Sequence, residues 1–472
     1  MASGEWEPLT GGRAWLAMLV IGFGALSVSV SQSVLVPVLP NLPAVLHTST
    51  ATAEWLLTAT LLVGAVSVPI FGRLGDMFGK RALFLVALGG LVLGAILAVQ
   101  TNNVALLIIA RAIQGTALAA IPLGIGLISS LVPRDKAVTA MAVVSAMLGV
   151  GGALGLPMAG VIAQHSDFHV LFWVIGIAGA LSVVATLFLV PEAPGRPGGR
   201  VDVPGSVLLG AMLTAVLLAL SEGTTWGWGS PLTLSLLVIS VPLAVGFARY
   251  ETRIALPIVD LRAAARRPIV LTNCSTLLMG VAMFAALIGT APYVQAPRST
   301  GYGFGSSIIV SGLCVLPCGL FSFIFAPMTA RLLRKVGADR TLALGGLTVA
   351  VGWLLRIFAT GSLWEIVLGS TILGAGSGIG YASMPTLIGH YTDLSSIAAA
   401  NGINSLSRTL GGAIATSVGG SLLSASTVLL AGQHWPSLTA YRMLFILCAG
   451  AGVLAAVLAI RIGRPGAEPQ SA

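Results

Sequence analysis

Charged residues are scarce in this chain of 472 residues. Asp, Glu, Lys and Arg together make up 8% of it, whereas they make up about a quarter of a soluble globular domain. So little charge cannot cover a water-facing surface of this size, and the apolar residues, 56% of the chain, fall in long runs. These observations exclude a soluble protein and an intrinsically disordered one. The sequence predicts a protein that lies in a lipid bilayer.

Cysteines and catalytic motifs are scarce as well. The four cysteines lie one by one within apolar runs, without a CxxC pair, at Cys274, Cys314, Cys318 and Cys448. They indicate neither a disulfide framework nor a metal site, and we expect no metal or other cofactor. HExxH, carboxylate-pair and nucleotide-loop motifs are missing, and no loop is long enough for a catalytic domain. We therefore expect that the chain is not an enzyme and is not itself driven by ATP.

Apolar runs, by contrast, are abundant. A bilayer core of about 30 Å needs roughly 20 apolar residues per helix. Fourteen windows of this kind are bounded by charge, Pro or Gly. They cover residues 13–36, 52–71, 82–100, 104–131, 138–163, 168–190, 204–221, 230–248, 269–293, 304–329, 341–359, 364–388, 396–424 and 440–461.

The positions of Lys and Arg predict the orientation of these spans. With the amino terminus inside, nineteen of the 24 basic residues fall in cytoplasmic segments, Arg298 and Arg442 fall outside, and Arg111, Arg356 and Arg408 fall within spans. Such an excess on one side is the positive-inside pattern. We expect a multi-pass protein of the plasma membrane with both termini in the cytoplasm. The basic residues thus serve topology, and no nucleic-acid partner is expected.

An internal repeat divides the chain. A shift of 258 positions aligns Pro69, Arg73 and Gly79 with Pro327, Arg331 and Gly337. Transporters are often built from such duplicated bundles. We predict an amino-terminal six-helix bundle in residues 1–195, two inserted helices with their linkers in 196–267, and a carboxy-terminal six-helix bundle in 268–472.

Several motifs resemble those of the major facilitator superfamily. Residues 72–81 resemble its signature between spans 2 and 3, residues 111–116 its span 4 motif, and residues 149–160 the span 5 motif of its drug antiporters. Residues 221–228 and 404–412 are similar to its fourteen-helix drug:proton antiporter branch. The resemblance implies the major facilitator fold: an all-α polytopic membrane protein with two six-helix bundles plus two inserted central helices.

The resemblance also assigns roles to the motif residues. The first motif implies a gate that stabilises one access state, although a solvated topological anchor is the plainer interpretation. The span 5 motif implies an antiporter contact between the halves, although its small residues also suit close packing. The gating residues are Gly72, Arg73, Gly75, Asp76, Gly79, Lys80 and Arg81, and the antiporter residues are Gly149, Gly151, Gly155, Pro157 and Gly160.

Arg111 lies deep in its span, where a charge is costly unless it faces a wet cavity or a partner. By resemblance it assists proton coupling; snorkelling to the outer interface is the alternative. We expect Ser31, Gln114, Asn404 and Arg408 to line the cavity with it, although Arg408 is as well explained by pairing near the cytoplasmic end. Arg356 we expect to snorkel.

A proton-coupled carrier also needs a carboxylate whose proton affinity changes with access state. The branch usually has an Asp in span 1, but Ser31 stands at that position here. Glu54 and Glu222 are the remaining candidates for coupling, and each is also explained as an ordinary interfacial charge.

The resemblance implies a secondary exporter. Its substrates would be hydrophobic or amphipathic small molecules, such as antibiotics, dyes or an endogenous secondary metabolite, exchanged for protons by alternating access, and a monomer suffices. Three alternatives remain open: an uptake permease for a metabolite, a lipid-moving member of the same fold, and a receptor or scaffold that transports nothing.

Overall fold

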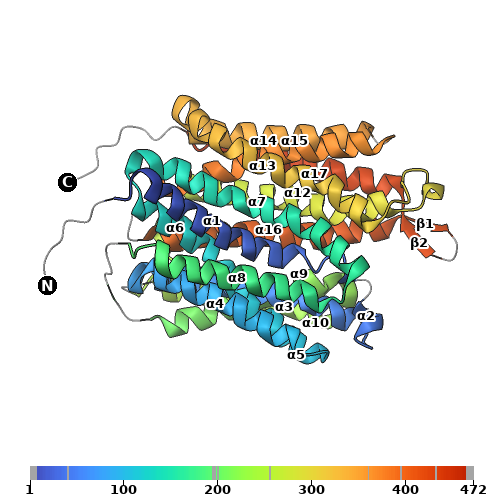
Figure 1. Ribbon diagram of the computed structural model, residues 1–472, viewed down its shortest axis with the longest axis horizontal. Coiled ribbons are helices and arrows are strands. Elements are labelled where there is room, and N and C mark those ends of the chain that lie inside the picture. The colour runs from blue at the N-terminus through green and yellow to red at the C-terminus, as the bar shows by residue number, and fades with distance from the viewer. Residues whose placement is uncertain are drawn as a thin grey trace, which may run out of the picture.

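The computed structural model describes residues 8–39, 42–193, 198, 201–254, 257–359, 361–393, 396–430 and 433–463. Long helices that run side by side make up most of these residues (Figure 1). In chain order the elements are α1 (Gly11–Ser33), α2 (Leu42–Val45), α3 (Thr50–Phe78), α4 (Lys80–Val99), α5 (Val104–Gly115), η2 (Thr116–Ala119), α6 (Ala120–Leu131), α7 (Arg134–His165), α8 (His169–Leu189), α9 (Val203–Trp226), α10 (Pro231–Glu251), α11 (Leu261–Ala264), α12 (Arg267–Gln295), η3 (Arg298–Thr300), α13 (Ile308–Val336), α14 (Ala338–Phe358), α15 (Leu363–His390), α16 (Ile397–Ala425), β1 (Thr427–Leu430), β2 (Gln433–Pro436) and α17 (Leu438–Ile460).

Thirteen helices in the described residues are long and apolar enough to cross a membrane, and each coincides with a predicted span. The remaining predicted span, 396–424, coincides with α16, which is 29 residues long but richer in Asn, Ser and Gly. Its polar side chains are compatible with a membrane because α16 packs against α3, α6, α9 and α12, so protein rather than lipid surrounds much of it. The all-α polytopic architecture is thus confirmed, and the crossing by α16 stays a prediction.

The helices form two main hydrophobic cores. One joins buried side chains of α1, α3, α4, α5, α6, α7 and α8, and the other joins those of α12, α13, α14, α15, α16 and α17. The two sets meet chiefly where α7 packs on α13 and where α3 packs on α16. These two crossings position Asp76 of the predicted gate and Gly149, Pro157 and Gly160 of the predicted antiporter motif.

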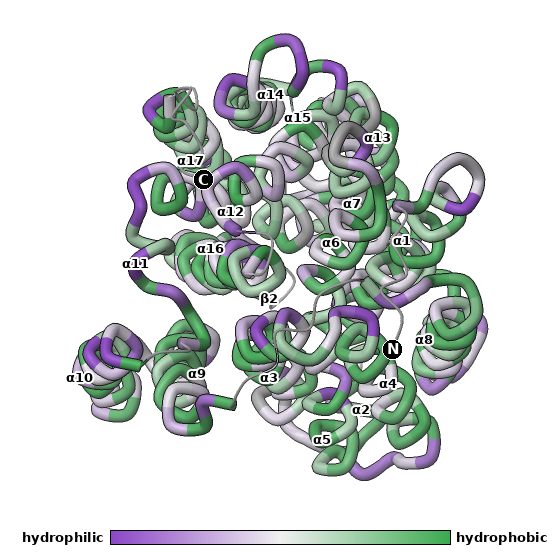
Figure 2. Tube along the Cα trace, turned by 90° about the vertical axis from the view of Figure 1, so that its left-hand side faces the viewer, coloured by the Kyte–Doolittle hydropathy of each residue, from purple (hydrophilic) through white to green (hydrophobic). Residues whose placement is uncertain are grey.

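Helices α9 and α10 stand apart from both cores. In Figure 2, which looks onto the end of the molecule at which α1 begins, α10 is outermost and α9 lies between α10 and α3. A third, small core holds the pair in place through Leu209 and Leu213 of α9, Phe247 of α10 and Leu406 of α16. Only 17% of the 18-residue apolar stretch of α10 is buried, so most of this helix faces the surroundings of the protein.

A short hairpin is the one strand structure within the described residues. Strands β1 and β2 pair antiparallel between α16 and α17, at the end of the molecule that also carries α2 (Figure 1). These strands lie between the predicted spans 396–424 and 440–461. Thr427, Val428 and Trp435 favour extended backbone, and Val428 pairs directly with Trp435.

Candidate functional site

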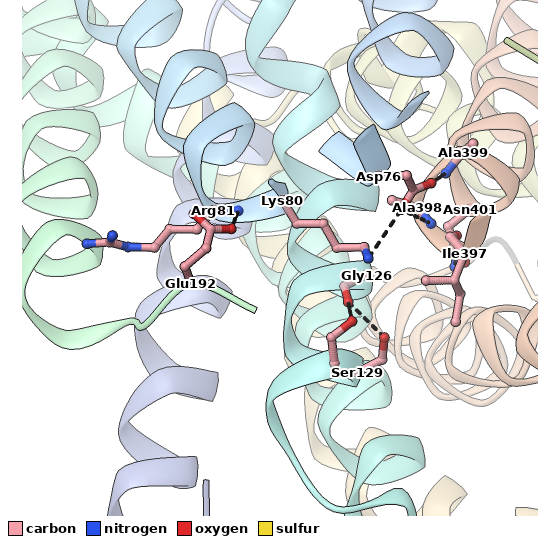
Figure 3. A network of polar contacts seen from close by, with 11 residues as sticks. Asp76, Lys80, Arg81, Gly126, Ser129, Glu192, Ile397, Ala398, Ala399 and Asn401 are labelled. Atoms are coloured by element: carbon pink, nitrogen blue, oxygen red, sulfur yellow. Dashed lines mark hydrogen bonds and ion pairs between the residues drawn. The ribbon is translucent and has the colours of Figure 1, made fainter. Parts of the chain in front are cut away.

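Asp76 connects the two halves of the molecule. Its carboxylate accepts hydrogen bonds from the backbone N–H groups of Ala398 (3.4 Å) and Ala399 (2.9 Å), which belong to the first turn of α16. The first N–H groups of a helix have no partner inside the helix and carry its positive dipole end, so a carboxylate is favourable there. Lys80 lies 3.2 Å from the same carboxylate (Figure 3). The side chain of Asp76 is only 1% exposed, and this contact therefore excludes water.

Glycines allow the first turn of α16 to approach α3 and α6 closely. A Cβ on Gly72 would stand 3.0 Å from the carbonyl oxygen of Ala398, and one on Gly126 of α6 would stand 3.0 Å from Ala398 Cβ. Gly79 alone links α3 to α4, with φ of +118°, a conformation that L side chains rarely adopt. The spacing of the motif is therefore a requirement of the turn and of the contact with α16.

The basic residues of the motif point in different directions. Arg81 faces away from Asp76, and its backbone N–H donates to Glu192 (3.1 Å; Figure 3). Its guanidinium donates to the carbonyl of Leu187 (2.7 Å) at the end of α8. Arg73 lines two adjoining pockets between α3 and the linker after α10. Gly75 packs against Leu123 of α6. Asp76 and Lys80 make the polar contact between the halves, and Arg73 lines a pocket that Ala399 and Ile403 of α16 also line.

In the described residues, the repeated loop of the second half shows the same turn but no carboxylate like that of Asp76. Gly337 has φ of +93° and links α13 to α14 as Gly79 links α3 to α4. Arg334, however, stands at the position of Asp76, and its side chain is exposed. The repeat therefore preserves the turn and changes the chemistry.

Arg111 is enclosed within the first bundle. Its guanidinium donates to the carbonyl of Leu56 in α3 (3.0 Å), to the carbonyl and hydroxyl of Ser31 in α1 (3.1 and 3.3 Å) and to Gln114 Oε1 (2.7 Å). The residue is 1% exposed, so it does not snorkel. Within the described residues, every hydrogen bond of this guanidinium goes to a neutral oxygen. Ser31 and Gln114 are enclosed with it, and their contact with substrate stays a prediction.

Arg356 was expected to snorkel, and that prediction is wrong. It is 1% exposed, and its guanidinium donates to the hydroxyls of Thr290 in α12 (2.6 Å) and Ser370 in α15 (2.7 Å). It also lies 5.5 Å from the ring centroid of Trp353. Sequence position suggested an interfacial end, but α12 and α15 cover the side chain. Arg111 and Arg356 are thus enclosed in one bundle each, and each binds a hydroxyl on the first helix of its bundle.

Glu54 and Glu222 are brought together by α3 and α9. Glu222 is 2% exposed, and it accepts a hydrogen bond from Thr58 of α3 (3.3 Å). Glu54, one turn before Thr58 in the same helix, is half-buried and interacts electrostatically with Glu222. Helix α9 continues to Trp226, past the predicted end of its span at residue 221, so Glu222 lies inside the helix. The two candidate carboxylates are thus near enough to interact electrostatically, which the sequence did not predict.

The antiporter residues divide between two faces of α7. Gly149, Pro157 and Gly160 face α13 of the other half, where a Cβ on Gly312 would stand 2.9 Å from Pro157 Cα. Gly151 and Gly155 instead face α1, at Ser29 and Ser33. The contact between the halves predicted for this motif is therefore made by part of it, and the rest packs α7 onto its own bundle.

Asn404 and Arg408 lie on α16. Asn404 is buried and donates to Asn273 (2.9 Å) and Thr276 (2.7 Å) of α12. Arg408 donates to Ser405 (3.0 Å) and lies 5.3 Å from the ring centroid of Tyr381 in α15. Both residues therefore join helices of the second half, and their contact with substrate stays a prediction.

Comparison with known proteins fixes the family. The family model described as Major Facilitator Superfamily matches residues 21–352 and 278–472. This chain belongs to the major facilitator superfamily. The fold agrees: a crystal structure of the human organic anion transporter MFSD10 (TETRAN) matches 95% of this chain and 100% of that one with a TM-score of 0.66, at 15% sequence identity. The chain is thus a multi-pass membrane transporter of small molecules.

Two bacterial relatives within the superfamily indicate the range of substrates. The tetracenomycin C resistance and export protein of Streptomyces glaucescens is 27% identical over 88% of this chain and 76% of its own length. The uridine/deoxyuridine transporter of Lactococcus lactis is 26% identical over 76% of this chain and 76% of its own length. Export of an antibiotic and transport of a nucleoside are therefore both represented among its relatives.

Proposed function

We propose that this chain exports hydrophobic or amphipathic small molecules across the plasma membrane, in exchange for protons and by alternating access. Antibiotics, dyes and an endogenous secondary metabolite are the substrate classes. Its two halves would be residues 1–195 and 268–472, with residues 196–267 as the inserted pair and both termini in the cytoplasm. The proposal places the chain in the fourteen-helix drug:proton antiporter branch.

The contact of Asp76 with α16 is the observation that carries the proposal. It joins the halves through hydrogen bonds to a helix end, and these can break and re-form without unfolding either bundle. The basic loops predict that this end faces the cytoplasm. The structure would then be the state in which the cytoplasmic side is closed.

The enclosed polar groups on the outer half supply the coupling in this proposal. Glu222 and Glu54 can exchange a proton because two neighbouring carboxylates do not readily ionise together. Arg111, which binds the backbone of α1 and α3, would keep the helices beside that pair in place. Hydrophobic burial and a few polar contacts would then select substrate by shape.

Accumulation of lipophilic compounds in an efflux-deficient bacterium tests the proposal. The panel contains cationic, neutral and anionic compounds, with and without a protonophore, in cells with the wild type, Glu222→Gln, Arg111→Ala or an empty vector. We expect the wild type to lower accumulation of some compounds and the protonophore to abolish the effect. Glu222→Gln and Arg111→Ala should each reduce the lowering of accumulation by the wild type at least tenfold. A tenfold reduction corresponds to a loss of about 1.4 kcal/mol of transition-state stabilisation. Arg442→Ala, at an exposed position, is the matched control.

Other outcomes would replace the proposal. Higher accumulation in cells with the wild type would indicate an uptake permease, for which the uridine/deoxyuridine transporter is the precedent among relatives. No response to any compound, with the protein present in the membrane, would contradict the export of drug-like molecules. A dedicated metabolite or a lipid would then be the better hypothesis.

A further inference from the structure

Two buried carboxyl groups lie where the inserted helices meet the linkers, at the end of the molecule that carries the Asp76 contact. Asp202 stands just before α9 and is 7% exposed. Glu251 is the last residue of α10 and is 2% exposed. Neither belongs to the coupling residues or to the motif at residues 72–81.

Hydrogen bonds satisfy half of each carboxyl group. Asp202 Oδ1 accepts from the N–H of Gly205 (2.9 Å) and from the hydroxyl of Tyr250 (3.0 Å), and Glu251 Oε1 accepts from the N–H of Val259 (2.6 Å). The other oxygens, Asp202 Oδ2 and Glu251 Oε2, are buried without a donor from the described residues. A Cβ on Gly205 would collide with Asp202 Oδ2 and would stand 3.0 Å from Glu251 Oε2. Both oxygens therefore face the same point.

A proton between these oxygens supplies the missing donor. Two adjacent buried carboxylates repel each other and are costly to desolvate, and a shared proton removes one charge and adds one hydrogen bond. A metal ion suits the site poorly, because Ca²⁺ and Mg²⁺ need about six oxygen ligands and no group of three metal-binding side chains occurs in the described residues. We propose that Asp202 and Glu251 form a proton-binding site in which one carboxyl group is protonated near neutral pH and donates to the other.

The site adjoins the motif that closes the two halves. Asp202 and Ser206 line a small pocket together with Arg73, Leu74 and Met77 of α3. The charged and titratable groups that face the carboxyl pair in the described residues are Arg73 from α3 and Tyr250 from α10. A cation favours the ionised form of a neighbouring carboxyl group. Movement of Arg73 toward or away from Asp202 would therefore release or retain the proton.

Infrared difference spectroscopy of the purified full-length protein tests the site without any substrate, so its outcome is independent of the proposed transport. The carbonyl stretch of a protonated carboxyl group is followed as the pH is raised, in the wild type, Glu251→Gln and Asp202→Asn. Each amide keeps the acceptor oxygen and offers an N–H to its partner, so both variants should fold. Asp260→Asn, at an exposed helix cap outside any proposed proton site, is the matched control.

We expect each amide variant to lose the same single protonated carboxyl group per molecule, and Asp260→Asn to keep it. Thermal unfolding gives a second measurement. The folded state holds a proton that free carboxyl groups, with pKa values of about 4, do not hold at neutral pH. Wild-type stability should therefore fall as the pH rises through release of that proton, and the amide variants should lack this dependence. Arg73→Gln should move the release to higher pH.

Two results would overturn the proposal. A protonated carboxyl signal that is unchanged in both amide variants would mean that the pair is ionised. Stabilisation of the wild type by sodium at constant pH, absent in Glu251→Gln, would mean that the site holds a metal cation.

Discussion

Asp76 is the residue on which the contact between the halves depends. Asp76→Asn keeps the size of the side chain, but it removes the charge and one of the two acceptors for the N–H groups of Ala398 and Ala399. We expect the contact to lose about 1.5 kcal/mol, so the population open at this end rises about tenfold. Distances between spin labels at Phe78→Cys and Asp393→Cys, in a Cys274→Ser background, measure the population that is open at this end.

The background is chosen because Cys274 is exposed and the other three cysteines are buried. Asp260→Asn removes a carboxylate from the cap of α11 and should leave the distances unchanged. An unchanged distance distribution in Asp76→Asn would show that the carboxylate does not hold the halves together.

Substitution of Ser31 tests whether the buried charge of Arg111 lacks a charged partner. Ser31 Oγ lies 3.3 Å from the guanidinium, so Ser31→Asp would place a carboxylate against a buried cation that now has neutral partners. Ser31→Asn is a control of the same size without the charge. We expect the Asp variant to be more stable than the Asn variant by about 2 kcal/mol, measured by thermal unfolding. Equal stability would mean that Arg111 already has a charged partner.

The crossing of α7 and α13 is the feature to test at the scale of elements. A side chain at Gly312 would meet the backbone of Pro157 at 2.9 Å, so Gly312→Val forces the two helices apart. We expect overpacking to destabilise the protein by about 1–3 kcal/mol. Gly246→Val in α10 is the control, because a Cβ there meets nothing within 4 Å. Thermal unfolding in lipid nanodiscs compares the two, and equal losses would contradict close packing at this crossing.

At the scale of the whole molecule, the crossing of the membrane by α16 and the orientation are measured together. We predict that alkaline phosphatase is inactive when it is fused after Asp393, before α16, and active when it is fused after Ser426, where α16 ends. A green fluorescent protein at either terminus should fluoresce. Activity in both phosphatase fusions, or in neither, would mean that α16 does not cross.

The candidate site was predictable from sequence only in part. The spacing of Gly72, Asp76 and Gly79 predicted a tight turn and a gate, and the structure places Asp76 in contact with the other half. The partners of Asp76 were not predictable, because backbone N–H groups leave no side-chain signal at Ala398 and Ala399. The pairing of Asp202 with Glu251 was missed for a similar reason, since each looks like an ordinary charge at the end of a span.

The sequence by itself determined that this protein lies in a membrane, how long its helices are and to which family it belongs. Scarce charge, apolar runs and glycine spacing are local properties of the chain. Tertiary structure alone decided which polar groups face one another. Arg111 meets Ser31 across 80 positions of sequence, and Arg356 is enclosed rather than interfacial. Hydropathy measures the average cost of burying a residue, whereas the partner that offsets that cost depends on how helices pack.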